Sequence, residues 1–213
     1  MHVPRSHQSR PLFLLNGRSG IISGDCSSGA TTARLGEELR RAHWISATHL
    51  HYPPTRAIDW WSASKRREIA NSIVNQIRAQ SGFEPVDIVA HSMGCDIIRE
   101  VEEITGGMEF RRIVLIAPAM DHRYDWTQHN FERMLVMRNP GDRAILWGAM
   151  LPVHRFGWAG RRGFEITDSR MEDMVIEDVG KLDRWRHSHY FRSWGLVRTG
   201  LEVEMFLTEE MIS

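Results

Sequence analysis

The sequence has few cysteines, no net charge and no long apolar run, and each absence excludes a class of protein. Cys26 and Cys95 are the only two cysteines, which excludes a disulfide framework and does not favour a bridge between them. Lys plus Arg and Asp plus Glu each number 27, so neither a nucleic-acid nor a membrane-surface partner is expected. The apolar runs are too short to span a bilayer, and residues 1–10 lack the apolar segment of a secretory signal. We therefore expect a cytoplasmic protein.

What the chain does contain is an alternation of short apolar runs with amphipathic stretches. Strands are expected at 11–16, 43–52, 86–90, 112–117, 134–138 and 174–179, and helices at 32–41, 60–80, 93–104, 143–151 and 191–213. This alternation predicts a single α/β domain over residues 1–213, with a mostly parallel central sheet, helices on both faces and a flexible segment at 1–10. The short basic pairs are expected on solvated faces: Arg66–Arg67, Arg111–Arg112 and Arg161–Arg162.

The segment Ala90-His91-Ser92-Met93-Gly94 matches the pattern G-x-S-x-G, with Ala at the first Gly position. A buried strand is expected to lead into this segment and a helix to lead out of it, which is the setting that a nucleophile turn requires. Small residues two positions before and after the Ser allow the sharp turn that lifts its hydroxyl above the strand end. We therefore predict that Ser92 is a nucleophile, in preference to an incidental Ser at a strand–turn–helix junction.

With this motif in this setting, the chain resembles the α/β-hydrolase superfamily. The resemblance is closest to small bacterial lipase-like or esterase-like members that lack a cap domain, many of them of unknown function, and it covers about residues 11–191. It implies the order Ser, acid, His along the chain. The implied acid is Asp142, in the turn after an expected strand, with Asp121 as the runner-up. Asp is also a favoured residue at helix N-termini, and Asp142 can serve both purposes.

The resemblance places the catalytic base in a loop near the end of the chain. There it implies His187 in Arg186-His187-Ser188-His189, with His189 as the alternative. His154 is a weaker candidate, in a stretch at 151–163 that could instead cover the site.

An oxyanion hole needs two N–H groups that receive the developing negative charge. The resemblance assigns one to Met93 and the other to the loop Asn16-Gly17-Arg18, where Arg18 N–H is favoured and Gly17 is next. The alternative for this loop is a plain Asn-Gly turn.

The leading functional hypothesis is a serine esterase that hydrolyses a small acyl ester through an acyl-enzyme and uses no cofactor and no metal. Thioester or amide hydrolysis and acyl transfer would use the same residues. A non-catalytic binding protein on a degenerate hydrolase fold is a second hypothesis. A metal enzyme that uses the pairs His49-x-His51 and His187-x-His189 is a third. Most of the eight Trp are expected in the core or partly covered, and the oligomeric state is left open.

Overall fold

The computed structural model describes residues 11–17, 30–43, 45–52, 62–82, 84–107, 110–150, 157–176, 186–191 and 193–209. The following residues, on which predictions were made, lie outside these ranges: 1–10, Arg18, Cys26, Trp44, Trp60, Trp61, His154 and Trp185. Within these ranges, no helix is both long and apolar enough to cross a membrane.

The described strands form one sheet in which every pairing is parallel. Its order is β2-β1-β3-β4-β5-β6. The strands are β1 (Leu12–Leu15), β2 (Ala47–Leu50), β3 (Val86–His91), β4 (Phe110–Ile116), β5 (Phe131–Arg138) and β6 (Met171–Val175). The chain starts at β1, turns to β2 on one side and then crosses to β3 on the other. The strand order therefore reverses at β1 and β3, and open α/β sheets bind ligands outside the carboxyl ends of strands at such a point.

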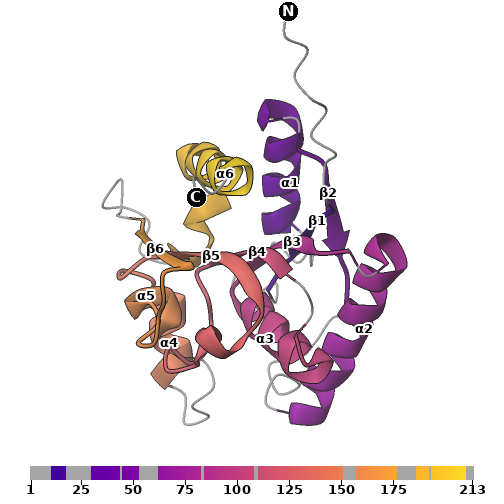
Figure 1. The fold of residues 1–213 in the computed structure, drawn as a ribbon. Helices are drawn as coiled ribbons and strands as arrows, with labels where there is room; N and C mark the ends of the chain where they lie inside the picture. Colours follow the sequence, from indigo (N-terminus) through magenta and orange to yellow (C-terminus); the bar gives the residue numbers. More distant parts are fainter. Residues whose placement is uncertain are drawn as a thin grey trace, which may run out of the picture.

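Helices cover both faces of this sheet, as predicted. In Figure 1 the helices α1 (Ala30–His43) and α6 (Ser193–Thr208) lie above the sheet. The others lie below it: α2 (Ala63–Ser81), α3 (Met93–Thr105), α4 (Arg143–Met150) and α5 (Ala159–Arg162). Strand β1 is buried on every residue, with Phe13 and Leu15 in one apolar core and Leu12 and Leu14 in the other. The expected α/β fold is confirmed.

Several predicted boundaries were wrong, among them the start of β5, which is Phe131 and not residue 134. Three others have a clear structural reason. His43 ends α1 instead of opening a strand, because its ring pairs with Glu204 of α6, Nδ1 to Oε2 at 2.7 Å. Strand β6 begins at Met171, three residues before the predicted start. It is the partly exposed edge of the sheet, so it lacks the continuous apolar run that marks the inner strands. The closing helix begins at Ser193, because residues Arg186–Phe191 form a 3₁₀ turn.

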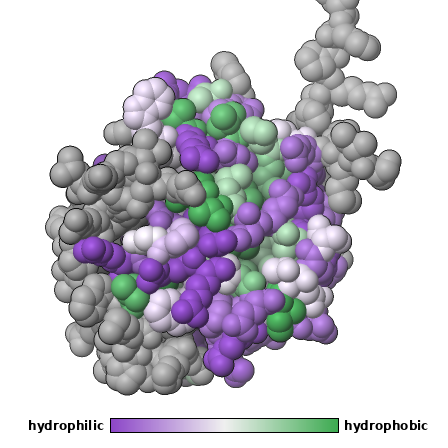
Figure 2. Space-filling view, turned by 90° about the vertical axis from the view of Figure 1, so that its left-hand side faces the viewer, coloured by the Kyte–Doolittle hydropathy of each residue, from purple (hydrophilic) through white to green (hydrophobic). Residues whose placement is uncertain are grey.

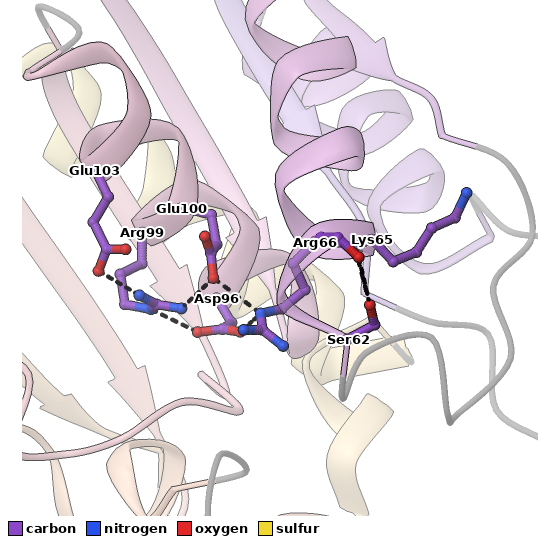
Figure 3. Close-up of polar contacts among 8 residues, drawn as sticks. Ser62, Lys65, Arg66, Asp96, Arg99, Glu100 and Glu103 are labelled. Carbon is purple, nitrogen blue, oxygen red and sulfur yellow. Dashed lines mark hydrogen bonds and ion pairs between the residues drawn. The ribbon is translucent and has the colours of Figure 1, made fainter.

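The expectation of solvated basic pairs was also wrong in part. Arg66 is buried in an ion cluster that joins α2 to α3 (Figure 3). Its Nε lies 2.9 Å from Oε1 of Glu100, and Arg99 binds both Asp96, at 2.7 Å, and Glu100, at 2.8 Å. Arg99 also pairs with Glu103. A buried charge is tolerated only with such partners, and these come from a different helix, which a local pattern does not reveal.

Arg112 is a second buried member of a basic pair. Its guanidinium donates to the carbonyl oxygen of Phe206 at 2.7 Å and to that of Glu209 at 2.5 Å. These carbonyl groups lie at the end of α6, where the last carbonyls of a helix have no N–H partner within the helix and need donors from elsewhere. Arg111 instead pairs with Asp87, Nη2 to Oδ2 at 2.9 Å. The start of β4 is therefore bound to β3 through Arg111 and to the end of α6 through Arg112.

Candidate active site

Ser92 lies in the turn between β3 and α3 and has an unusual backbone conformation. Its φ is 56° and its ψ is −125°, a region that residues other than Gly rarely adopt. Two hydrogen bonds from the end of β4 hold this conformation. Ser92 N–H donates to the carbonyl oxygen of Ile116 at 2.9 Å, and Ala119 N–H donates to the carbonyl oxygen of Ser92 at 3.1 Å. The hydroxyl is thus presented above the carboxyl end of the sheet.

The small residues around Ser92 are required by close backbone contact. A Cβ on Gly94 would lie 2.9 Å from the carbonyl oxygen of Leu15, so α3 begins directly against the end of β1. A Cβ on Gly17 would lie 2.6 Å from Ser92 Cβ and 2.9 Å from Met93 N. The loop after β1 therefore packs onto the turn that carries Ser92, beside the N–H of Met93.

Three side chains far apart in the sequence form a continuous hydrogen-bonded chain. His187 Nε2 lies 2.5 Å from Ser92 Oγ, and His187 Nδ1 lies 2.7 Å from Asp142 Oδ2. Asp142 is fully buried, and its other oxygen accepts the N–H of Ile145 at 3.0 Å. Burial alone would raise the pKa of Asp142, but His187 and the Ile145 N–H hold it below its ordinary value. Asp142 therefore stays ionised while it caps α4 and accepts from the His187 ring.

Of the runner-up candidates, only Asp121 lies among the described side chains, and it is not part of this chain of hydrogen bonds. Asp121 is half-exposed and binds Arg123, Nη2 to Oδ2 at 3.1 Å. The side chain of His189 lies outside the described part of the structure, as do His154 and Arg18. Among the described residues, no three His, Cys, Asp or Glu side chains gather as metal ligands would. The hypothesis of a metal enzyme therefore has no ligand set in the part of the chain that can be assessed.

His91 is a site residue that the sequence reasoning missed. Its ring is buried with its centroid 4.9 Å from that of His187, and its Nε2 lies 3.3 Å from the His187 carbonyl oxygen. On its other side, Nδ1 lies 3.3 Å from Asn16 Oδ1, and the ring meets Phe191 edge to face. His91 thus connects the loop after β1 to the segment that carries His187. The only available signal was its place inside the nucleophile motif.

Burial, followed by the neighbouring His187, lowers the pKa of His91 to about 3. The ring is therefore neutral at ordinary pH. A neutral imidazole donates from one nitrogen and accepts at the other, so His91 adds no positive charge beside His187.

Comparison with known proteins adds to this geometry. A family model described as Serine hydrolase matches residues 37–145, just over half of the chain. The chain belongs to this family. It is accordingly a serine hydrolase of the α/β-hydrolase superfamily, and the family relationship is evidence that it is an enzyme. A search among curated proteins finds no match.

Solved structures agree with the fold at low sequence identity. A lidless α/β serine hydrolase from Xanthomonas campestris is 12% identical, with a TM-score of 0.54, 92% of this chain covered and 78% of that one. A thioesterase from the prodiginine pathway of Streptomyces coelicolor is 11% identical, with a TM-score of 0.53 and coverage of 92% and 90%. Est1E from Butyrivibrio proteoclasticus is 11% identical, with a TM-score of 0.54 and coverage of 96% and 90%.

Proposed function

We propose that this serine hydrolase cleaves carboxylic esters through an acyl-enzyme, with Ser92 as nucleophile, His187 as base and Asp142 as acid. The observation that carries the proposal is the unbroken chain from Ser92 Oγ to His187 Nε2 and from His187 Nδ1 to Asp142 Oδ2, at 2.5 and 2.7 Å. A nucleophile within hydrogen-bond reach of a base that is itself oriented by a carboxylate is the arrangement of activated serines.

The reaction would proceed in two halves. Ser92 Oγ attacks the acyl carbon while His187 Nε2 takes the hydroxyl proton, and His187 then returns that proton to the leaving alkoxide. In the second half His187 takes a proton from a water molecule as that water attacks the acyl-enzyme, and it then gives the proton to Ser92 Oγ as the acid is released. Asp142 stabilises the imidazolium in each half and fixes which ring nitrogen faces Ser92.

The oxyanion of each tetrahedral intermediate would lie at the N-terminus of α3. The N–H of Met93 is the first donor, aided by the positive end of the helix. The loop after β1 would supply the second donor, from Arg18 or Gly17. The close approach of Gly17 to Met93 N supports this assignment, because it brings the loop beside the first donor.

The test is reaction with a fluorophosphonate, in which Ser92 Oγ displaces fluoride from phosphorus and His187 takes the proton. We expect the intact mass of the wild type to increase by one adduct, and Ser92→Ala to gain none. Ser64→Ala, which removes an exposed hydroxyl on α2, is the matched control and should label like the wild type. A folded wild type that gains no adduct would support a non-catalytic binding protein instead.

The ester linkage is tested separately from the nucleophile. The measurement is kcat/KM of the wild type for a series of acyl esters of increasing chain length and for the matched thioesters. We expect higher kcat/KM values for the esters. One of the similar structures is a thioesterase, so a preference for thioesters is the principal alternative. That outcome would keep the triad and change the substrate class.

A further inference from the structure

Helix α6 carries an exposed apolar stripe along its outer side. The stripe consists of Trp194, Val197, Leu201 and Met205, which are 84%, 45%, 46% and 47% exposed. Their spacing of three, four and four residues keeps them on one face of the helix. The opposite face holds Val203, Phe206 and Leu207, which are buried against the sheet. The outer face of α6 is therefore as apolar as a face that packs.

Such a stripe is unusual on a surface that is otherwise polar. Figure 2 shows a face on which hydrophilic residues predominate, with apolar patches mainly in the upper half, the level at which α6 lies in Figure 1. Scattered exposed apolar residues need no explanation, but a contiguous patch that includes a Trp marks an interaction site. The spacing along α6 is that of the seam between two packed helices.

We propose that this stripe is the contact of a homodimer, in which the α6 helices of two copies pack antiparallel about a two-fold axis. The charges beside the stripe fit this arrangement. Arg198 and Glu202 lie one helical turn apart, with Nε and Oε1 separated by 3.8 Å, and the midpoint of the pair is residue 200. The midpoint of the stripe lies between residues 199 and 200. An antiparallel pairing about this point puts Arg198 of each copy near Glu202 of the other copy, which makes two symmetric ion pairs.

The other arrangements fit less well. In a parallel pairing, Arg198 of one copy would lie at the same height as Arg198 of the other. The two ion pairs between Arg198 and Glu202 of different copies would then not form. A lipid surface is the other common partner of an exposed apolar helix, but membrane-binding helices carry mainly Lys and Arg beside the apolar face. Among its described charged residues, α6 has one Arg against Glu202 and Glu204. This balance favours a protein partner, and the reciprocal charges favour a second copy.

A stable dimer buries about 800 Å² on each partner, with an apolar centre and a polar rim. The four stripe residues would form the centre and the charged pair part of the rim. The inference does not depend on the ester chemistry proposed above, since no stripe residue belongs to the triad.

The experiment is sedimentation equilibrium of the full chain from micromolar to hundreds of micromolar concentration. We expect the wild type to approach twice the 24.7 kDa subunit mass, and Leu201→Glu to remain a monomer throughout. Ile166→Glu is the matched control, because Ile166 is 43% exposed but lies outside α6, and it should dimerise like the wild type. Circular dichroism and fluorophosphonate labelling would establish that each variant is folded.

Charge reversal tests the antiparallel geometry. Arg198→Glu should weaken the dimer roughly tenfold, because two symmetric pairs become repulsive. The double variant Arg198→Glu with Glu202→Arg should restore wild-type affinity. A wild type that stays monomeric at the highest concentration would overturn the proposal. So would a monomer that binds phosphatidylcholine vesicles and loses this binding in Leu201→Glu, because the stripe would then contact lipid.

Discussion

At the scale of single residues, Asp142 combines a structural role with the proposed chemical one. Its Oδ1 caps α4 and its Oδ2 accepts from His187. Asp142→Asn keeps an oxygen for the cap but offers the His187 ring an amide donor, which favours the wrong tautomer. We expect fluorophosphonate labelling and ester turnover to fall about 10⁴-fold with little change in thermal stability. A loss below about tenfold would mean that Asp142 only caps the helix.

His91 is expected to position the base. His91→Phe would preserve ring packing against His187 and Phe191 but remove the polar contacts to Asn16 and to the His187 carbonyl. Given the proposed triad, we expect kcat to fall roughly ten- to a hundredfold with KM little changed, because His91 orients the base and not the substrate. His91→Gln, which returns a polar group near the Nε2 position, should recover part of kcat. Equal kcat values for wild type and Phe variant would show that His91 only fills space.

The raised pKa of the buried Glu102 side chain should make the free energy of unfolding depend on pH. Its side chain is buried without a hydrogen-bond donor among the described residues, with His129 Nδ1 at 3.4 Å, and burial raises its pKa from 4.5 to about 8. Between these values the folded protein holds a proton that the unfolded chain releases. The stability that this proton contributes is therefore lost as pH rises.

Glu102→Gln removes this titration while keeping the side-chain shape. We expect the wild type to lose about 1 kcal/mol of unfolding free energy per pH unit, relative to the variant, from about pH 5 to 8. Denaturant unfolding at several pH values measures the difference. Parallel curves for the two proteins would contradict the assignment.

At the scale of elements, the ion cluster in Figure 3 joins α2 to α3 and so supports the helix that begins at Ser92. Arg66→Ala leaves Asp96 and Glu100 with less positive charge in a buried setting. We expect a loss of about 3 kcal/mol in unfolding free energy, measured with urea. Arg67→Ala removes the same side chain from an exposed neighbouring position, and we expect a change within about 0.5 kcal/mol. A loss for Arg66→Ala as small as that for Arg67→Ala would show that the cluster adds little stability.

The inner elements could be predicted because their patterns are local. Strand β1 is a continuous apolar run, and β3 and β4 each contain a shorter apolar run, at 88–90 and 113–116. The apolar positions of α2 recur at helical spacing. The start of β6, which was predicted three residues too late, and helix α5, which was not predicted, do not follow from local patterns. Strand β6 lies at the sheet edge, and α5 has one turn, whose Gly160 packs so closely on Pro118 that a Cβ would lie 2.9 Å from its carbonyl oxygen. Burial against a distant segment, not periodicity, places these elements.

At the scale of the whole molecule, one parallel sheet lies between two apolar cores. Because both cores share this sheet, we expect the chain to unfold as one domain. Calorimetry of the Leu201→Glu variant, in which dimer dissociation should not contribute, should give one transition with equal calorimetric and van't Hoff enthalpies. Two transitions would contradict a single domain.

The sequence by itself determined the fold class and the place of the strand–turn–helix junction at Ser92, because buried strands, such a junction and its small residues are patterns of neighbouring positions. Only the tertiary structure decided which distant groups meet. It placed His187 between Ser92 and Asp142 and left the outer face of α6 exposed. It also brought His91 into contact with the loop after β1 and with the segment that carries His187. Hydrogen bonds and burial depend on distances between segments that the order of residues does not record, so these features required the folded chain.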